Sequence, residues 1–210
     1  FQLDSTEVVH LGHDLGPLPT GCMQHGELSR ALANSSGSFI CVGTLEPRKN
    51  LDIVIDAFDA LWNDGGTFSL VLIGRAGWMC EDLLTRIRHH TERGNRLFWF
   101  NDVGDTDLVL AYRKASALIF PSVVEGFGLP LVEALSQGLP VIASDIEVFR
   151  EIAGEHVRYF PPHDMQALIR IVNEQLGECP RADPSPFLWP TWEESTRKLL
   201  LVLRAFSVRK

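Results

Sequence analysis

Short apolar runs recur along the chain from Ser38 onward, and a stretch with helical spacing follows each one. The runs are rich in Val, Ile, Leu and Phe and show little alternation, as is typical of strands buried on both faces of a parallel sheet. The predicted strands cover residues 39–44, 69–74, 96–100, 117–121, 140–144 and 157–160.

Apolar residues between these strands repeat at helical spacing. In residues 51–62, one face of a helix holds Ile53, Val54, Ala57, Phe58 and Leu61. The predicted helices cover residues 51–62, 81–93, 105–114, 130–137, 148–153, 165–176 and 192–206.

The alternation of strands and helices predicts an α/β fold. Parallel strands joined by right-handed crossovers form a doubly wound, mainly parallel six-stranded Rossmann-like sheet with helices on both faces. Polar residues support two of the helix starts. Asn50 is expected to cap the helix at 51–62, and Asp105 or Thr106 the helix at 105–114.

Composition shifts divide the chain into three parts. Residues 1–37 are linker-like, with a short strand at 7–11 and a Gly/Pro-rich loop at 10–37; residues 38–178 form the Rossmann-like domain; residues 179–210 hold a Pro-rich loop and a final helix. The chain has no initiator Met and opens as if in the middle of a protein, so we expect a fragment.

Charge and cysteine content restrict the function. Among 210 residues, 19 Lys and Arg stand against 27 Asp and Glu, a net charge of −8 that argues against a nucleic-acid-binding module. The four cysteines form no C-x-x-C pair, which argues against a zinc site or a disulfide framework and favours a reducing compartment. No apolar run is long enough to span a membrane and no signal peptide is evident, so a cytoplasmic location is expected.

Two cations follow the first predicted strand. Arg48 and Lys49 lie in a turn directly before a helix, where free amides and the helix dipole favour phosphate. An exposed basic turn is the alternative interpretation.

A Gly-rich turn with two carboxylates follows the fourth predicted strand. Gly126 and Gly128 allow a close backbone approach, and Pro130 fits a first helical position, so the local amides form a second anion cradle. Glu125 and Glu133 flank this turn and are expected at the rim of the crevice. Paired carboxylates also suit a glycosidase, but the neighbouring cations and amides favour a diphosphate ligand. In the plainest interpretation, Glu133 complements the helix dipole and Glu125 caps the loop.

Other chemistry is less well supported. The chain has no P-loop and no G-x-G-x-x-G fingerprint. The adjacent His89 and His90 cannot face one ligand from a helix. The Asp105–Thr106–Asp107 triplet is interpreted as a helix start, so no metal site is predicted.

Together these motifs resemble a known family. E-G-F-G-L-P-L-V-E-A, with its E-x7-E spacing from Glu125 to Glu133, is preceded by I-F-P-S and followed by G-L-P-V-I-A-S, and V-G-T-L-E-P-R-K-N lies upstream. The chain looks like the C-terminal donor-binding domain of the retaining family 4 glycosyltransferases, whose GT-B fold has two Rossmann-like halves. L-I-G-R-A-G-W and W-P-T-W-E-E-S are similar to O-antigen mannosyl- and rhamnosyltransferases.

The resemblance implies roles for the charged residues. Arg48 and Lys49 would bind the donor diphosphate and stabilise it as a leaving group. Glu125 would accept hydrogen bonds from hydroxyls of the donor sugar, and Glu133 would bind the ribose hydroxyls.

It also implies backbone contacts. Amides of Phe127, Gly128 and Leu129 would meet the sugar and phosphate, and Gly43 would leave room where acceptor and phosphate meet. Main-chain atoms from Asn101 to Val103 would face the base, where many relatives have a Gly-containing turn.

The implied function is transfer of a sugar, with GDP-mannose favoured as donor, to a glycan or lipid-linked acceptor in surface polysaccharide or lipopolysaccharide synthesis. The anomeric configuration would be retained, by double displacement or by same-face attack, without a metal or other cofactor. A missing N-terminal domain would bind the acceptor, this chain alone would be inactive, and the full protein could associate peripherally with the inner face of the bacterial membrane. The alternatives are a non-catalytic nucleotide-sugar or protein-binding module, a UDP-sugar-using transferase, and a sugar-nucleotide epimerase.

Overall fold

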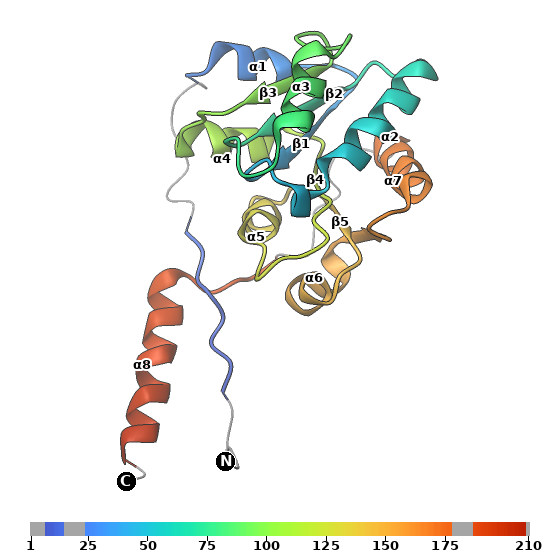
Figure 1. Cartoon of the computed structure of the whole chain (residues 1–210). Coiled ribbons are helices and arrows are strands. Elements are labelled where there is room, and N and C mark those ends of the chain that lie inside the picture. Colours follow the sequence, from blue (N-terminus) through green and yellow to red (C-terminus); the bar gives the residue numbers. More distant parts are fainter. Residues whose placement is uncertain (1–6, 15–23, 178–186, 209–210) are drawn as a thin grey trace.

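Six parallel strands form one sheet at the centre of the molecule (Figure 1). The computed structural model describes residues 7–14, 24–177 and 187–208. The strands are β1 (Ser38–Val42), β2 (Ser69–Ile73), β3 (Leu97–Phe100), β4 (Ala117–Phe120), β5 (Val141–Ser144) and β6 (Arg158–Phe160). Their order is β3-β2-β1-β4-β5-β6. The predicted fold class is confirmed, and each predicted strand is present within two residues at either end.

Helices connect the strands and cover both faces of the sheet (Figure 1). They are α1 (Gly26–Leu32), α2 (Leu51–Asn63), α3 (Glu81–His89), α4 (Asp105–Lys114), α5 (Leu129–Ser136), α6 (Glu147–Ala153), α7 (Met165–Gly177) and α8 (Trp192–Val208), with 3-10 turns at Pro47–Lys49 and Gly154–His156. The helix predicted at 81–93 ends at His89, because His90 is extended and its ring lies 2.8 Å from the Asp59 carboxylate of α2.

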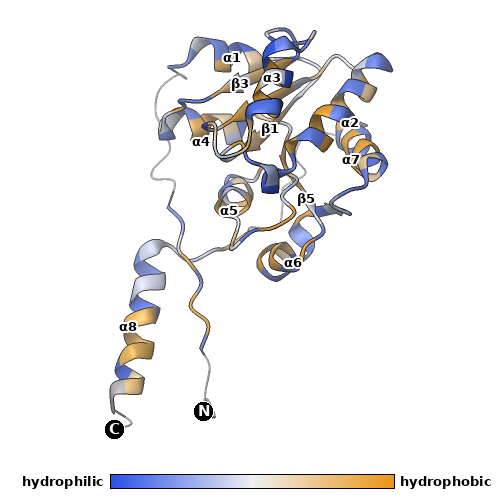
Figure 2. Ribbon diagram, in the orientation of Figure 1, coloured by the Kyte–Doolittle hydropathy of each residue, from blue (hydrophilic) through white to orange (hydrophobic). Residues whose placement is uncertain are grey.

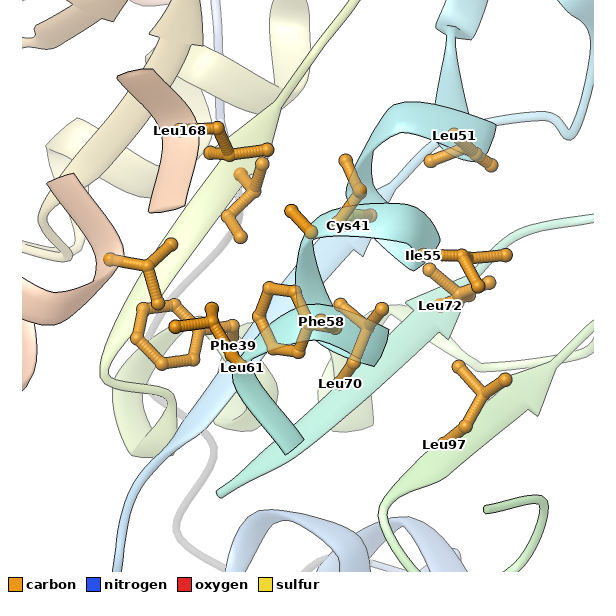
Figure 3. Packing of buried hydrophobic residues seen from close by; sticks show 14 of the residues in the cluster. Phe39, Cys41, Leu51, Ile55, Phe58, Leu61, Leu70, Leu72, Leu97 and Leu168 are labelled. Carbon is orange, nitrogen blue, oxygen red and sulfur yellow. The ribbon is translucent and has the colours of Figure 1, made fainter. Parts of the chain in front are cut away.

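Alternate residues of each strand enter two separate cores. In β1, Phe39 and Cys41 pack against α2, whereas Ile40 belongs to the opposite core. Figure 3 shows the first core, in which Leu70 and Leu72 of β2 lie beneath Ile55, Phe58 and Leu61 of α2, with Leu168 of α7 beside them. The second core lies under α1, α4, α5 and α6. Burial on both faces explains why the strands read as continuous apolar runs.

Two expectations for the N-terminal part are wrong. Residues 7–14 contain no strand, because they lie beside the 187–198 segment and not at an edge of the sheet; Val8 and Leu11 are exposed. The predicted loop at 10–37 contains α1. This helix forms because Leu28, Ala31 and Leu32 share one buried face.

Both predicted N-terminal caps are also wrong. Asn50 precedes α2 in a left-handed conformation (φ 50°), which points its side chain away from the helix amides; its Nδ2 donates to the Pro162 carbonyl at 2.7 Å. Gly104 precedes α4, and no side chain caps that helix. Asp107 instead accepts hydrogen bonds from the amides of residues 24 and 25, at 2.8 and 3.0 Å.

The two ends of the described chain run together, away from the sheet (Figure 1). Residues 7–14 lie beside α8 and the residues before it: the His13 amide donates to the Pro190 carbonyl at 3.0 Å, and Lys198 Nζ to the Val8 carbonyl at 2.8 Å. Figure 2 shows an apolar band on α8, where Leu199, Leu201 and other large side chains are exposed. Within the described ranges, no helix has the length and hydropathy to cross a membrane. The Pro-rich stretch at 180–186, Cys22 and Cys179 lie outside the described residues.

An ionic network joins α2 to α3. Arg86 lies between Asp52, Asp56 and Asp59, with guanidinium–carboxylate distances of 3.3, 2.6 and 3.1 Å. Replacing Arg86 with Met should lower the free energy of unfolding by about 1–2 kcal/mol, since three carboxylates on one helix face then repel one another.

Urea denaturation at pH 7 would measure this loss, with the exposed Arg88→Met on the same helix as the control. The difference between the two variants should shrink at pH ~3, where carboxylates are protonated. Equal stability of the two variants at pH 7 would show that the network contributes nothing.

Candidate active site

The carboxyl ends of β1 and β4 meet where the strand order of the sheet reverses, which is the usual place for a ligand crevice in an open α/β sheet. The loops that follow the two strands are joined, because the Val123 amide donates to the Arg48 carbonyl at 2.9 Å. A small cleft between the loops is lined by residues of both, including Gly43, Lys49 and Ser122.

The cations of the first loop contact the first glutamate of the second. Arg48 Nη1 lies 2.7 Å from Glu125 Oε2, and Lys49 Nζ pairs with Oε1 of the same carboxylate. Ser122 Oγ donates to Oε1 at 2.8 Å, and Arg48 Nη2 lies 2.6 Å from Glu46 Oε1. Residues proposed separately as diphosphate ligands and as a sugar ligand are therefore parts of one ionic cluster.

This cluster is largely shielded from water. The Glu125 side chain is 8% exposed and that of Lys49 10%, whereas that of Arg48 is 37% exposed. Burial disfavours the Glu125 carboxylate, but hydrogen bonds from Lys49, Ser122 and Arg48 outweigh it and hold the pKa of Glu125 below its ordinary value. Glu125 is thus ionised at neutral pH, and it can accept hydrogen bonds but cannot donate a proton.

The Gly-rich turn lies between β4 and α5. Gly128 takes up a left-handed conformation (φ 106°) at the start of α5, and a Cβ there would lie 3.0 Å from the Phe149 ring. Among the described residues, the amides of Phe127, Gly128 and Leu129 donate no hydrogen bond. Pro130 occupies the second helical position, one later than expected. The turn therefore presents backbone donors at the N-terminus of α5, and their use as an anion-binding site stays a prediction.

Glu133 occupies a different environment from Glu125. It lies on α5, is half-buried, and accepts a hydrogen bond from the Tyr112 hydroxyl of α4 at 2.8 Å. Burial raises the pKa of Glu133, an effect that Tyr112 and the charge of His13 partly offset and that Asp105 reinforces. The two glutamates of the E-x7-E element therefore differ: cations lower the pKa of Glu125, and burial raises the pKa of Glu133.

The residues expected to face a base lie at the same edge of the sheet, beyond β2. Asn101 and Asp102 are exposed after β3, while Val103 is half-buried against the second core. Arg75 lies 4.0 Å from Asp102, and both side chains are more than 80% exposed, so this ion pair adds little stability. Asn101 lines a separate open hollow with Arg75, Ala76 and Asp102, apart from the cleft that holds Lys49.

Four contacts of the site escaped the sequence interpretation. Glu46 and Ser122 lie within three residues of predicted site residues, and their polar side chains in these loops could have indicated that they belong to the site. Tyr112 and His13 act on Glu133 from distant segments, and no sequence spacing indicates either of them.

The described residues hold no group of three or more His, Cys, Asp or Glu side chains that could bind a metal. His89 and His90 have separate partners: His89 Nδ1 lies 2.9 Å from the Thr85 carbonyl, and His90 lies beside Asp59. The Asp107 carboxylate is occupied by backbone amides. The side chains of Arg48 and Lys49 and the backbone amides at the start of α5 can bind an anion.

Known proteins show both the fold and this sequence pattern. A profile described as "Glycosyl transferases group 1" matches residues 29–181. The serotype-specific mannosyltransferase WbdA of Escherichia coli is 38% identical over 205 residues, which cover 94% of this chain and 25% of that protein. O-antigen chain mannosyltransferase B of E. coli is 35% identical over 146 residues, covering 68% of this chain and 37% of that protein.

Solved structures agree at the level of fold. Sucrose-phosphate synthase of Thermosynechococcus elongatus superposes with a TM-score of 0.71 at 20% identity, over 97% of this chain and 53% of that one. Anabaena HepE, in complex with UDP and glucose, superposes with a TM-score of 0.70 at 21% identity, over 94% of this chain and 56% of that one. The chain therefore spans about a quarter of the length of WbdA and about half the length of these structures.

Proposed function

Because the chain belongs to the group 1 glycosyl transferases (family 4), as one Rossmann-like half of their GT-B fold, we propose that it is the donor-binding domain of a retaining mannosyltransferase. GDP-mannose is the proposed donor, and a glycan or lipid-linked chain of a bacterial surface polysaccharide is the proposed acceptor. The names of the mannosyltransferases it resembles support the sugar. The enzyme would act on the cytoplasmic side of the membrane.

One observation carries the proposal: Arg48, Lys49 and Glu125 meet at the switch point of the sheet. The Lys49 ammonium has three donors and the Arg48 guanidinium five, so both can bind phosphate oxygens while they remain paired with Glu125. In a chain of net charge −8, Arg48 and Lys49 supply cationic hydrogen-bond donors to a diphosphate at this place.

The cluster suits departure of a nucleoside diphosphate. When the bond between the sugar C1 and the β-phosphate oxygen breaks, its electron pair stays on that oxygen, and the negative charge grows where Arg48 and Lys49 lie. The amides of Phe127, Gly128 and Leu129 add donors at the start of α5. The acceptor hydroxyl oxygen forms the new bond at C1, and its proton passes to the departing diphosphate or to water.

Glu125 fits a sugar-binding role and not that of a general acid. A carboxyl group with a lowered pKa is ionised at neutral pH and accepts hydrogen bonds from sugar hydroxyls. A glycosidase needs one carboxylic acid that is protonated near its working pH. Glu125 does not meet this requirement, so we assign it no role as a proton donor.

The exposed helix α8 supports the proposal that a second domain completes the enzyme. Its apolar side chains are uncovered and it stands apart from the sheet (Figures 1 and 2). The chain also spans about half the length of the solved structures it resembles. We place acceptor binding in that other half, against which α8 and residues 187–191 would pack.

Titration calorimetry with GDP, UDP, GDP-mannose and UDP-glucose tests the donor. We expect GDP and GDP-mannose to bind, at least about 10-fold more tightly than the uridine ligands, a difference of about 1.4 kcal/mol. Equal binding of both nucleotides would overturn the choice of base. The absence of any nucleotide binding by a folded sample would overturn the proposed function.

A further inference from the structure

Tyr112 is a fully buried tyrosine whose hydroxyl reaches the edge of the candidate site. It lies on α4 in the second core, among apolar side chains of α5 that include Leu131 and Val132. Its hydroxyl donates to Glu133 Oε2 at 2.8 Å. A buried tyrosine hydroxyl needs a hydrogen-bond partner, and this one has a carboxylate as its acceptor.

This contact fixes one oxygen of Glu133 and leaves the other. Oε1 accepts no hydrogen bond from a residue in the described ranges. The Glu133 side chain is thus held by its Oε2 atom, with its Oε1 atom available to a ligand. A half-buried carboxylate without such a partner would lose both its orientation and part of the stabilisation of its charge.

We propose that Tyr112 is a positioning residue for nucleotide binding, whose hydroxyl orients the Glu133 carboxylate so that its free oxygen accepts the hydroxyls of the ribose. The inference rests on the proposed function, because it assumes that a nucleotide binds here with its ribose at Glu133. It explains why a polar group is buried between α4 and α5, where a phenylalanine would fill the same space.

The test is Tyr112→Phe, with Tyr159→Phe as the matched control. The chain has two tyrosines, and the Tyr159 hydroxyl also has protein acceptors within hydrogen-bond distance, the Phe149 and Gly154 carbonyls at 3.0 and 2.9 Å. We expect Tyr112→Phe to raise the Kd for GDP about 5- to 10-fold and Tyr159→Phe to leave it unchanged. Tyr112→Phe should also lower the preference for GDP over 2′-deoxy-GDP, since the oriented oxygen serves the ribose.

A pH profile separates positioning from packing. GDP affinity of the wild type should fall as acid protonates Glu133, because a protonated carboxyl loses its strength as an acceptor. Removing the Tyr112 hydroxyl removes a stabiliser of the carboxylate, so the midpoint should move to higher pH. His13 and Asp105, the charged groups that also act on Glu133, stay in place in both tyrosine variants, and titration of the nucleotide phosphate is common to all samples.

Glu133→Gln completes the experiment and covers the case in which Tyr112→Phe folds poorly. It should weaken GDP binding and remove the fall in GDP affinity that protonation of Glu133 causes in acid. Adding Tyr112→Phe to Glu133→Gln should then leave the pH profile of GDP affinity unchanged. If Tyr112→Phe matches the wild type in its Kd for GDP, its preference for GDP over 2′-deoxy-GDP and the midpoint of its pH profile, the inference is overturned. The proposed function would still stand. A folded wild-type chain that binds no nucleotide would overturn both.

Discussion

Replacing Lys49 with methionine is expected to weaken GDP binding roughly 10- to 100-fold, the equivalent of about 1.5–3 kcal/mol for hydrogen bonds to a charged ligand. Lys49 lies in the cleft between the β1 and β4 loops, and its charge cannot be replaced by solvent because the side chain is largely buried. Methionine keeps the shape of the chain without the charge. Calorimetry at two salt concentrations would measure the loss.

Two variants serve as controls. Lys114→Met removes an exposed cation at the opposite edge of the sheet and should bind GDP like the wild type. Lys49→Met/Glu125→Gln also removes the buried carboxylate that the single variant leaves without its lysine. If Lys49→Met binds GDP as tightly as Lys114→Met does, the cationic cluster is not the phosphate site.

The same substitution has a pH-dependent effect on stability. The pKa of Glu125 is lower in the folded chain than in the unfolded one, so the cluster stabilises the fold above the unfolded pKa, and this contribution is lost as the pH falls through the folded value. Thermal denaturation should therefore show Lys49→Met less stable than the wild type at neutral pH, with the gap closing in acid. The double variant should show less of this pH dependence.

Much of the fold could be predicted because each strand and its following helix are local patterns. The β1 and β2 runs are buried on both faces, so their apolar character does not depend on contacts elsewhere. The errors occur where tertiary contacts decide the structure. Residues 7–11 read as a strand but have no strand beside them, and α1 is too short, and too close to glycines, to show a helical period.

The candidate site could be predicted in its residue types but not in its contacts. Position after a strand identified Arg48, Lys49 and Glu125 one by one, and the order of the strands brings them together. The order also places Asn101, which follows the edge strand β3, apart from these three residues. The Tyr112–Glu133 hydrogen bond joins two helices and leaves no signal in either segment.

Gly74→Ala is expected to cause the largest loss of stability, about 3–5 kcal/mol or complete unfolding. Gly74 directly follows β2 with φ 151°, and its amide donates to the Phe100 carbonyl at 2.9 Å. A Cβ on Gly74 would lie 1.9 Å from the Gly43 carbonyl oxygen, far inside any real contact. The neighbour is backbone, so it cannot turn aside as a side chain can.

Gly65→Ala separates the two parts of this cost. Gly65 also has a positive φ of 97°, but a Cβ there would meet nothing within 4 Å, so its alanine variant should lose only the roughly 1–3 kcal/mol of backbone strain. Urea denaturation should rank the wild type above Gly65→Ala and Gly65→Ala above Gly74→Ala. Because Gly43 lines the cleft beside Lys49, any Gly74→Ala protein that folds must displace the β1 loop and should bind GDP more weakly than Gly65→Ala does. Equal stability of the two alanine variants would contradict the prediction. It would mean that the backbone at Gly43 can move away from a Cβ on Gly74 without a cost in free energy.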